Sequence, residues 1–182
     1  SDAPYYELLI ELLESIRATA LYKDIPIMIL DAGLTDVDKT FIQKIFGPVN
    51  IKDPGWDIDI SGSNYLHNKK NLNGYKAMTA RPFIPKHFPG YRYYLWLDTD
   101  TWIQDERGLD ELINLACTQG IGICEDLHTI ESFYHAKQRR VAPKYQTPEI
   151  LSRHAIINGA FCIDMQSGLF EIWRKYFLEM YD

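Results

Sequence analysis

This sequence lacks paired cysteines and long apolar runs. Its three cysteines, Cys117, Cys124 and Cys162, are odd in number, and no two of them stand in CxxC spacing. A disulfide framework is therefore not expected, and we expect reduced, buried thiols of the kind found in cytosolic proteins. No apolar stretch reaches the roughly 18 residues that a membrane-spanning helix needs, so no transmembrane segment is predicted. We expect a cytoplasmic protein, with peripheral attachment to the inner face of a membrane left open.

Basic residues are also scarce, because 19 lysines and arginines stand against 25 acidic residues, giving a formal net charge of −6. The nearest thing to a basic cluster is Lys137, Arg139 and Arg140. This cluster is too short for the footprint that a phosphate backbone requires, so no nucleic-acid partner is expected. An acidic protein that binds a phosphorylated ligand needs local positive charge, from a metal ion or from a few placed basic side chains.

The length and the apolar periodicity indicate one α/β domain. The chain has 182 residues, 46% hydrophobic and 24% charged, which is ordinary for a soluble globular domain. Apolar residues at the helical period predict helices over 4–20, 35–46, 73–81, 109–117 and 167–181. Thr35 can cap the second of these helices. Short apolar runs predict strands over 25–30, 48–51, 93–97, 121–124 and 160–164, with a long solvent-facing loop at 53–71 and no assignment for 126–154. Continuously apolar strands separated by helices favour a mixed, mostly parallel sheet flanked by helices.

Two carboxylates follow the strongest predicted strand, in the run Leu97-Asp98-Thr99-Asp100. Ligands of open α/β sheets sit beyond the carboxyl ends of the strands. Residues at i and i+2 of a strand share a face, so Asp98 and Asp100 can converge on one point, where a hard divalent cation would relieve their repulsion. The alternative is that the pair caps a turn or faces solvent, because Asp-x-Asp alone is a weak motif.

Haloacid-dehalogenase-like phosphatases offer a rival interpretation of the same motif. Their strand is also followed by Asp-x-Asp, but Thr or Val stands two residues after the second Asp. Trp102 occupies that position here, and the motif lies in the middle of the chain. We therefore discount this class. Trp102 is instead a candidate wall of a pocket, or a core residue.

The chain resembles glycosyltransferase family 8 and its relatives with the GT-A fold. The resemblance spans nearly the whole chain, and no single motif decides it. Four segments match in order: Ser1-Asp2-Ala3-Pro4-Tyr5, Leu30-Asp31-Ala32-Gly33-Leu34-Thr35, Arg81 ahead of the Asp98 strand, and Ile157-Asn158-Gly159-Ala160-Phe161-Cys162-Ile163-Asp164 followed by Trp173.

The resemblance implies a role for each matching residue. Asp98 and Asp100 would bind Mn²⁺ or Mg²⁺, which bridges the phosphates of a UDP-sugar donor and acts as a Lewis acid on the leaving group. Arg81 would orient Asp98 and touch donor oxygens, although a structural ion pair is an alternative. The remaining expected donor-binding positions are Asp2 and Tyr5 at the uridine, Asp31, Thr99, and Asn158 and Gly159 near the sugar. Asp164 is equally well explained as a helix cap.

Two family features have no counterpart in this sequence. The family pattern has a strand before the segment that matches Asp2, and it supplies a third metal ligand, a His, beyond the helix that matches 167–181. None of the five histidines stands where that ligand belongs. The resemblance therefore implies a single GT-A catalytic domain that is incomplete at both ends.

We expect a metal-dependent glycosyltransferase that moves a hexose from a UDP-sugar to a saccharide or lipid-linked acceptor, with retention of anomeric configuration as in the family. A non-catalytic sugar-nucleotide-binding domain is an open alternative. A sugar-nucleotide pyrophosphorylase is less well supported, since its Gly-rich, basic sequence after the first strand is missing. The sequence does not predict the oligomeric state.

Overall fold

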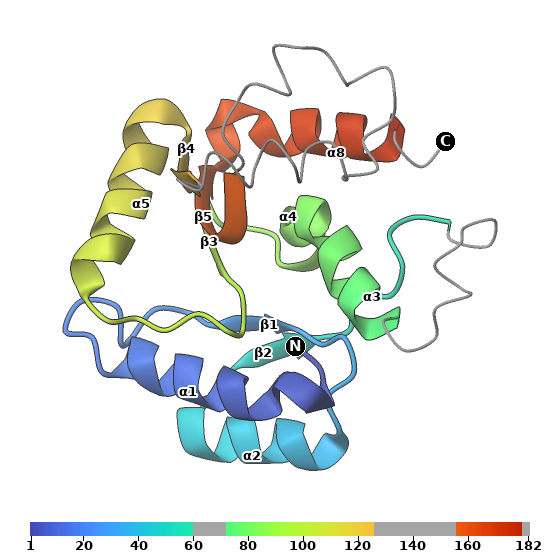
Figure 1. Ribbon diagram of the computed structural model, residues 1–182, viewed down its shortest axis with the longest axis vertical. Coiled ribbons are helices and arrows are strands. Elements are labelled where there is room, and N and C mark those ends of the chain that lie inside the picture. Colours follow the sequence, from blue (N-terminus) through green and yellow to red (C-terminus); the bar gives the residue numbers. More distant parts are fainter. Residues whose placement is uncertain (60–71, 126–155, 180–182) are drawn as a thin grey trace, which may run out of the picture.

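The computed structural model describes residues 1–59, 72–125 and 156–179 (Figure 1). The helices are α1 (Tyr6–Arg17), α2 (Asp36–Phe46), α3 (Leu72–Ala80), α4 (Ile84–His87), α5 (Glu106–Gln119) and α8 (Leu169–Glu179). The strands are β1 (Met28–Leu30), β2 (Asn50–Lys52), β3 (Tyr93–Leu97), β4 (Ile121–Glu125) and β5 (Ile156–Asp164).

The described strands form two sheets. β1 and β2 pair in parallel, and a parallel bridge between Asp2 and Gly33 adds the first residues of the chain alongside β1. In the other sheet β5 lies between β3 and β4 and is antiparallel to both. The expected mixed α/β class is thus confirmed, but parallel pairing does not dominate among the described strands. A continuously apolar strand indicates that both faces of the sheet are buried, and it does not determine whether the strands run parallel or antiparallel. Here helices cover both faces of an antiparallel sheet.

The β3–β5–β4 sheet is buried between α5 and α8 (Figure 1). On one face, Leu112 and Ala116 of α5 pack with Cys162 of β5. On the other face, Phe161 lies between two tryptophans, stacked on Trp96 at 6.3 Å and edge-on to Trp173 of α8 at 5.6 Å. A strand alternates its side chains between faces, so neighbouring residues of β5 serve different helices.

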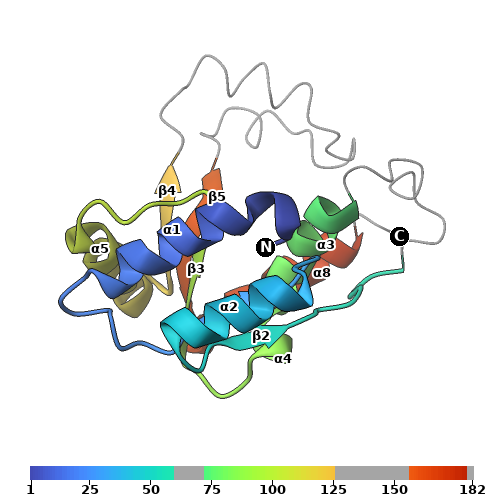
Figure 2. The same ribbon diagram turned by 90° about the horizontal axis from the view of Figure 1, so that it is seen from below.

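The helices α1 and α2 lie side by side in both ribbon views, at the lower end of the molecule in Figure 1 (Figures 1 and 2). A second core joins them to β1, with Leu9, Leu13, Ile29 and Ile42 all buried. Thr35 caps α2 as predicted, because its hydroxyl accepts from the backbone N–H of Asp38 while the Asp38 carboxylate accepts from the backbone N–H of Thr35.

Two local expectations need correction. Cys117 and Cys124 are exposed, although all three cysteines are free as predicted. Burial raises the pKa of the Cys162 thiol to about 11, so this thiol is unreactive at neutral pH. In the described part of the predicted 53–71 loop, Asp57 is buried against Lys86 and His87 and does not face solvent.

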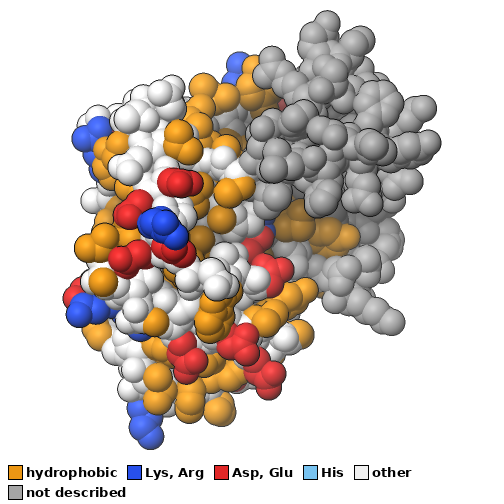
Figure 3. All heavy atoms as spheres, turned by 60° about the vertical axis from the view of Figure 1, so that its left-hand side comes forward, with side chains coloured by type: hydrophobic (Ala, Val, Ile, Leu, Met, Phe, Trp, Pro, Cys, Tyr) orange, Lys and Arg blue, Asp and Glu red, His pale blue; other side chains and the backbone are white. Residues whose placement is uncertain are grey.

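Two features of the structure bear on the expectations drawn from composition, namely the distribution of basic side chains and the apolarity of the helices. On the face in Figure 3, the basic side chains are scattered and do not gather into one patch. Among the residues that the structure describes, no helix has the length and apolarity that a bilayer crossing demands.

Helix α5 approaches the sheet closely at Gly122 of β4. A Cβ atom at this residue would lie 2.0 Å from the carbonyl oxygen of Leu112 in α5, which is too close for any side chain. We therefore expect Gly122→Ala to lower the free energy of unfolding by about 3 kcal/mol. Gly108→Ala, in the open first turn of α5, is the matched control and should raise it by about 0.5–1 kcal/mol. Urea denaturation measures both, and equal stabilities would contradict the packing of α5 on β4.

Candidate functional site at the carboxyl end of β3

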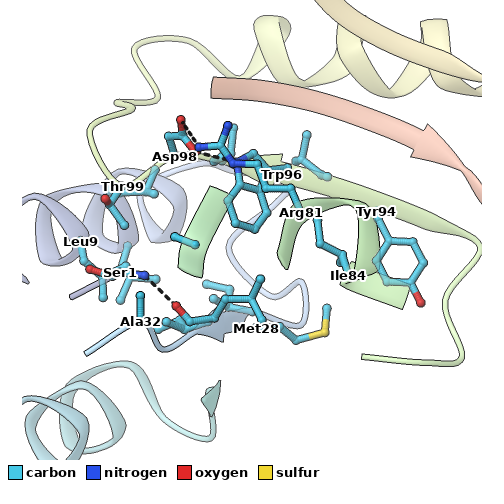
Figure 4. Close-up of a pocket in the computed structure, with 18 of the residues that line it drawn as sticks. Ser1, Leu9, Met28, Ala32, Arg81, Ile84, Tyr94, Trp96, Asp98 and Thr99 are labelled. Atoms are coloured by element: carbon cyan, nitrogen blue, oxygen red, sulfur yellow. Dashed lines mark hydrogen bonds and ion pairs between the residues drawn. The ribbon is translucent and has the colours of Figure 1, made fainter. Parts of the chain in front are cut away.

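The carboxylate of Asp98 lies at the carboxyl end of β3 (Figure 4). Nη2 of Arg81 donates to both of its oxygens, at 2.6 and 2.9 Å. The indole Nε1 of Trp96 donates to Oδ1 at 2.7 Å. Trp96 and Asp98 meet because residues two apart along a strand share a face. Three hydrogen bonds from two side chains therefore fix the direction of this carboxylate.

Arg81 reaches Asp98 from a 3₁₀ turn (Arg81–Phe83) that directly follows α3. The α-helix ends there because Pro82 has no N–H to continue it, and the turn directs the guanidinium of Arg81 toward the sheet. The guanidinium carbon lies 5.3 Å from the centroid of the Trp96 ring, within cation–π range. With its side chain only 11% exposed, Arg81 is a buried positive charge placed beside the carboxylate.

Gly159 of β5, which has no side chain, places its backbone next to Asp98. Its carbonyl accepts from the backbone N–H of Asp98 at 2.7 Å. A Cβ atom at this glycine would lie 3.4 Å from Oδ2 of Asp98, in van der Waals contact with the carboxylate. Asn158 precedes it in β5, and its side chain lies outside what the structure describes.

Beyond the strand the chain turns, with the backbone N–H of Thr101 donating to the carbonyl of Asp98 at 2.9 Å. Asp100 is exposed in this turn. Burial raises the pKa of Asp98, and the charge of Asp100 raises it further, while Arg81 and Trp96 act in the opposite direction. The negative charge of Asp100 thus disfavours ionisation of Asp98.

A cavity of about 880 Å³ opens at this point. Its lining includes six of the predicted site residues: Asp2, Tyr5, Arg81, Asp98, Thr99 and Asp100. They come from three segments that are far apart in the sequence. Trp102, which was a candidate wall, is 58% exposed and is not among the lining residues.

Asp31 lies outside this lining, and its carboxylate is engaged elsewhere. It accepts from the backbone N–H groups of Gly33 at 2.8 Å and Leu34 at 2.7 Å, and it pairs with Lys39 at 2.7 Å. These bonds shape the turn after β1. Asp164 likewise caps the backbone N–H of Gln166 and pairs with Arg92, which supports the helix-capping interpretation.

Sequence reasoning missed the contribution of Trp96, which it treated as a buried strand residue. The available signal was its position two residues before Asp98, which places its only polar atom on the same face as the carboxylate.

The donor chemistry of the site fits a hard divalent cation only in part. Carboxylate oxygens of Asp98 and Asp100 suit Mg²⁺ or Mn²⁺. Within residues 1–59, 72–125 and 156–179, no group of three or more His, Cys, Asp or Glu side chains is placed to hold a metal. The one histidine in those ranges, His87, bonds Asp57 at 2.7 Å and does not line the cavity. Among the described residues, these two carboxylates leave coordination positions open to a ligand or to water.

The fold that positions these residues is the GT-A fold of nucleotide-sugar-dependent transferases. It is seen in a crystal structure of the galactosyltransferase LgtC in complex with donor and acceptor sugar analogues, which matches with a TM-score of 0.60 and 18% identity. A structure of the LgtC active-site mutant Q189E matches with a TM-score of 0.59, also at 18% identity. All of this chain is covered in both matches, but it spans only 63% and 62% of those chains.

No known protein-family model matches the sequence, and no curated protein sequence does. At this identity the likeness shows the fold.

The raised pKa of Asp98 gives a direct test of the site. Because the folded state binds this proton more tightly than the unfolded chain, the free energy of unfolding falls as the pH rises from the ordinary aspartate range through the raised pKa. Asp100→Asn should lower the pKa of Asp98 by removing a repelling charge, and Arg81→Met should raise it. Carbon-13 NMR titration of the carboxyl groups measures both, with Glu111→Gln on exposed α5 as the control that changes nothing. An unshifted Asp98, or one insensitive to both variants, would contradict the geometry.

Proposed function

We propose that this domain belongs to a glycosyltransferase that moves a hexose from a nucleoside-diphosphate sugar, with UDP as the carrier, to a saccharide or lipid-linked acceptor. The observation that carries the proposal is the fixed Asp98 carboxylate at the mouth of the cavity, beside Asp100 and Arg81, within a GT-A fold. Ligands of such sheets lie at this edge. The activity of a whole protein is proposed here, since the chain spans 63% of LgtC.

The charge distribution suits a diphosphate leaving group. Breaking the bond between sugar and phosphate leaves negative charge on the departing nucleoside diphosphate. A Mn²⁺ or Mg²⁺ ion held by Asp98 and Asp100 would supply Lewis-acid stabilisation of that charge. Arg81 favours the ionised form of the Asp98 carboxylate against the burial that raises its pKa, and its guanidinium would lie near the donor oxygens.

The first residues of the chain offer a place for the nucleoside. Tyr5 is 48% exposed on the cavity wall, so its ring face is available for stacking on a base. Asp2 precedes the 3₁₀ turn Ala3–Tyr5, but its side chain makes no capping hydrogen bond. Its carboxylate is thereby available to accept from the N–H of uracil.

At the sugar end, Gly159 keeps the backbone of β5 close to Asp98. Retention of anomeric configuration and the role of Asn158 rest on the family resemblance. We assign no nucleophile.

A non-catalytic domain that binds sugar nucleotides is the second candidate. It is favoured by the incomplete donor set, since no three His, Cys, Asp or Glu side chains among the described residues are placed together to hold a metal. The two candidates differ in turnover and share the same binding site.

The binding site is tested by isothermal titration of UDP with and without Mn²⁺. Mn²⁺ should tighten UDP binding about tenfold or more, which is 1.4 kcal/mol. Asp98→Asn and Asp100→Asn should each abolish the gain, since they remove a ligand charge at nearly constant shape. Glu111→Gln removes one charge from the remote face of α5 and should keep the full gain. Equal UDP affinity with and without Mn²⁺ in the unaltered protein would overturn the metal assignment.

Release of UDP from a panel of UDP-hexoses then separates the two candidates. Turnover that depends on both Asp98 and Asp100 supports the transferase. Tight binding of UDP without release from any donor supports the non-catalytic domain.

A further inference from the structure

The outer face of α2 carries a row of exposed apolar side chains. Val37, Phe41 and Ile45 are 78%, 46% and 53% exposed, whereas Ile42 is fully buried and faces the core. Because residues four apart lie on one face of a helix, the three exposed side chains form a continuous apolar stripe. In Figure 1, α2 is the lowest helix of the molecule. A single exposed apolar residue needs no explanation, but a contiguous stripe indicates a contact surface.

A shallow groove of about 390 Å³ runs along this stripe. Its lining consists of Val37 and Phe41 from the apolar stripe together with Asp36, Thr40 and Lys44. The last three residues are also four apart, so they form a polar stripe beside the apolar one. None of these residues lines the cavity at the carboxyl end of β3, so the groove belongs to a different surface.

The polar stripe has opposite charges at its two ends. Asp36 lies in the first turn of α2 with its side chain fully exposed, and its contact with Lys39 is long, at 3.8 Å. Lys39 is held more closely by Asp31, at 2.7 Å. Lys44 lies in the last turn, and no described residue pairs with its ammonium group. The stripe therefore presents one available negative charge and one available positive charge, with the neutral Thr40 midway between them.

Such a surface is complementary to a second copy of itself. A two-fold axis through the middle of α2 would place Phe41 against Phe41 of the second copy and Val37 against its Ile45. The same axis would bring Asp36 of each copy alongside Lys44 of the other, since the helices then run antiparallel. An 11-residue helix is about 16 Å long, so one helix–helix contact includes the apolar stripe and both ion pairs. Ridges of side chains on one helix fit the groove of the other.

Charge argues against an anionic membrane surface as the occupant. Beside α2, helix α1 exposes Glu7, Glu11 and Glu14, and the chain has a formal net charge of −6. Helices that lie in a membrane surface carry lysines and arginines on their polar face. A second copy, in contrast, supplies a partner for each charged end of the stripe.

We propose that α2 forms the interface of a symmetric homodimer, in which the apolar stripes of two copies pack antiparallel and Asp36 of each copy pairs with Lys44 of the other. One short helix from each copy makes a smaller interface than that of a permanent dimer, so association is reversible, with a Kd of about 10–100 µM. The interface shares no residue with the lining of the cavity, so it is independent of the proposed sugar-nucleotide site.

Sedimentation velocity of the 182-residue chain, over concentrations that span the expected Kd, tests the apolar contact. The mean mass should rise from 21.2 kDa toward twice that value. Val37→Ser should weaken dimerisation about tenfold, because the stripe loses its most exposed apolar side chain at both ends of the interface. Leu115→Ser removes a side chain that is 45% exposed on α5 and should leave dimerisation unchanged.

Exchange of charges tests the antiparallel register. Asp36→Lys and Lys44→Asp each place like charges opposite one another at both ends of the pair, so each variant alone should dimerise about tenfold more weakly. A mixture of the two variants should associate again, because every charged contact across the mixed pair then joins opposite charges. Glu111→Lys on α5 makes the same change of charge as Asp36→Lys and should dimerise like the unaltered chain. Circular dichroism checks that each variant is folded.

A chain that remains monomeric over this range would overturn the proposal. So would equal dimerisation of Val37→Ser and Leu115→Ser, or a mixture of the two charge variants that fails to associate. Binding to phosphatidylglycerol vesicles that is lost in Val37→Ser would overturn it in favour of a membrane surface. None of these readouts involves UDP or a metal ion, so failure here is distinct from failure of the proposed function.

Discussion

The hydrogen bonds that hold the Asp98 carboxylate connect the core of the protein to its candidate site. Trp173 of α8 packs on Phe161, Phe161 stacks on Trp96, and the indole of Trp96 donates to Asp98. From the other side, Arg81 ties the end of α3 to the same carboxylate. The position of one charged group thus depends on two helices and two strands. A rigid scaffold of this kind is what a site for a charged ligand requires.

Holding the carboxylate in this way opposes stability. Burial raises the pKa of Asp98, and Asp100 adds a like charge nearby, so the ionised form is disfavoured despite Arg81. If Arg81 and Asp98 formed only a structural ion pair, the pair would be more stable without the negative charge of Asp100 beside it. The combination is understandable if a cationic ligand arrives at the mouth, because its charge would offset both the burial and the repulsion. The same reasoning would explain how an acidic protein could receive the diphosphate of the proposed donor at this edge.

Local patterns in the sequence predicted much of this arrangement. The aromatic run 93–97, the Thr35 cap and the carboxylates after the strand depend on neighbouring residues, and the structure has all three features. Strand direction in the β3–β5–β4 sheet was not predictable, because it is set by pairings between residues about 70 positions apart, such as Tyr93 with Asp164. The pattern Asp31-Ala32-Gly33 is typical of a turn in which the aspartate accepts from nearby backbone N–H groups, so this role of Asp31 could have been predicted. The family resemblance favoured a donor-binding role instead. Segment 126–154 lies outside the described residues.

The central claim is that Asp98 and Asp100 seat a cation together with a nucleoside diphosphate. The most direct measurement is paramagnetic broadening of assigned amide resonances by Mn²⁺ in the presence of UDP. The account predicts that the amides of Thr99, Asp100 and Gly159 broaden first, at Mn²⁺ concentrations that leave Val37 of α2 sharp, and that UDP is required. Broadening centred on another acidic region, such as Asp53 to Asp57, or the same broadening in the Asp98→Asn variant, would contradict it.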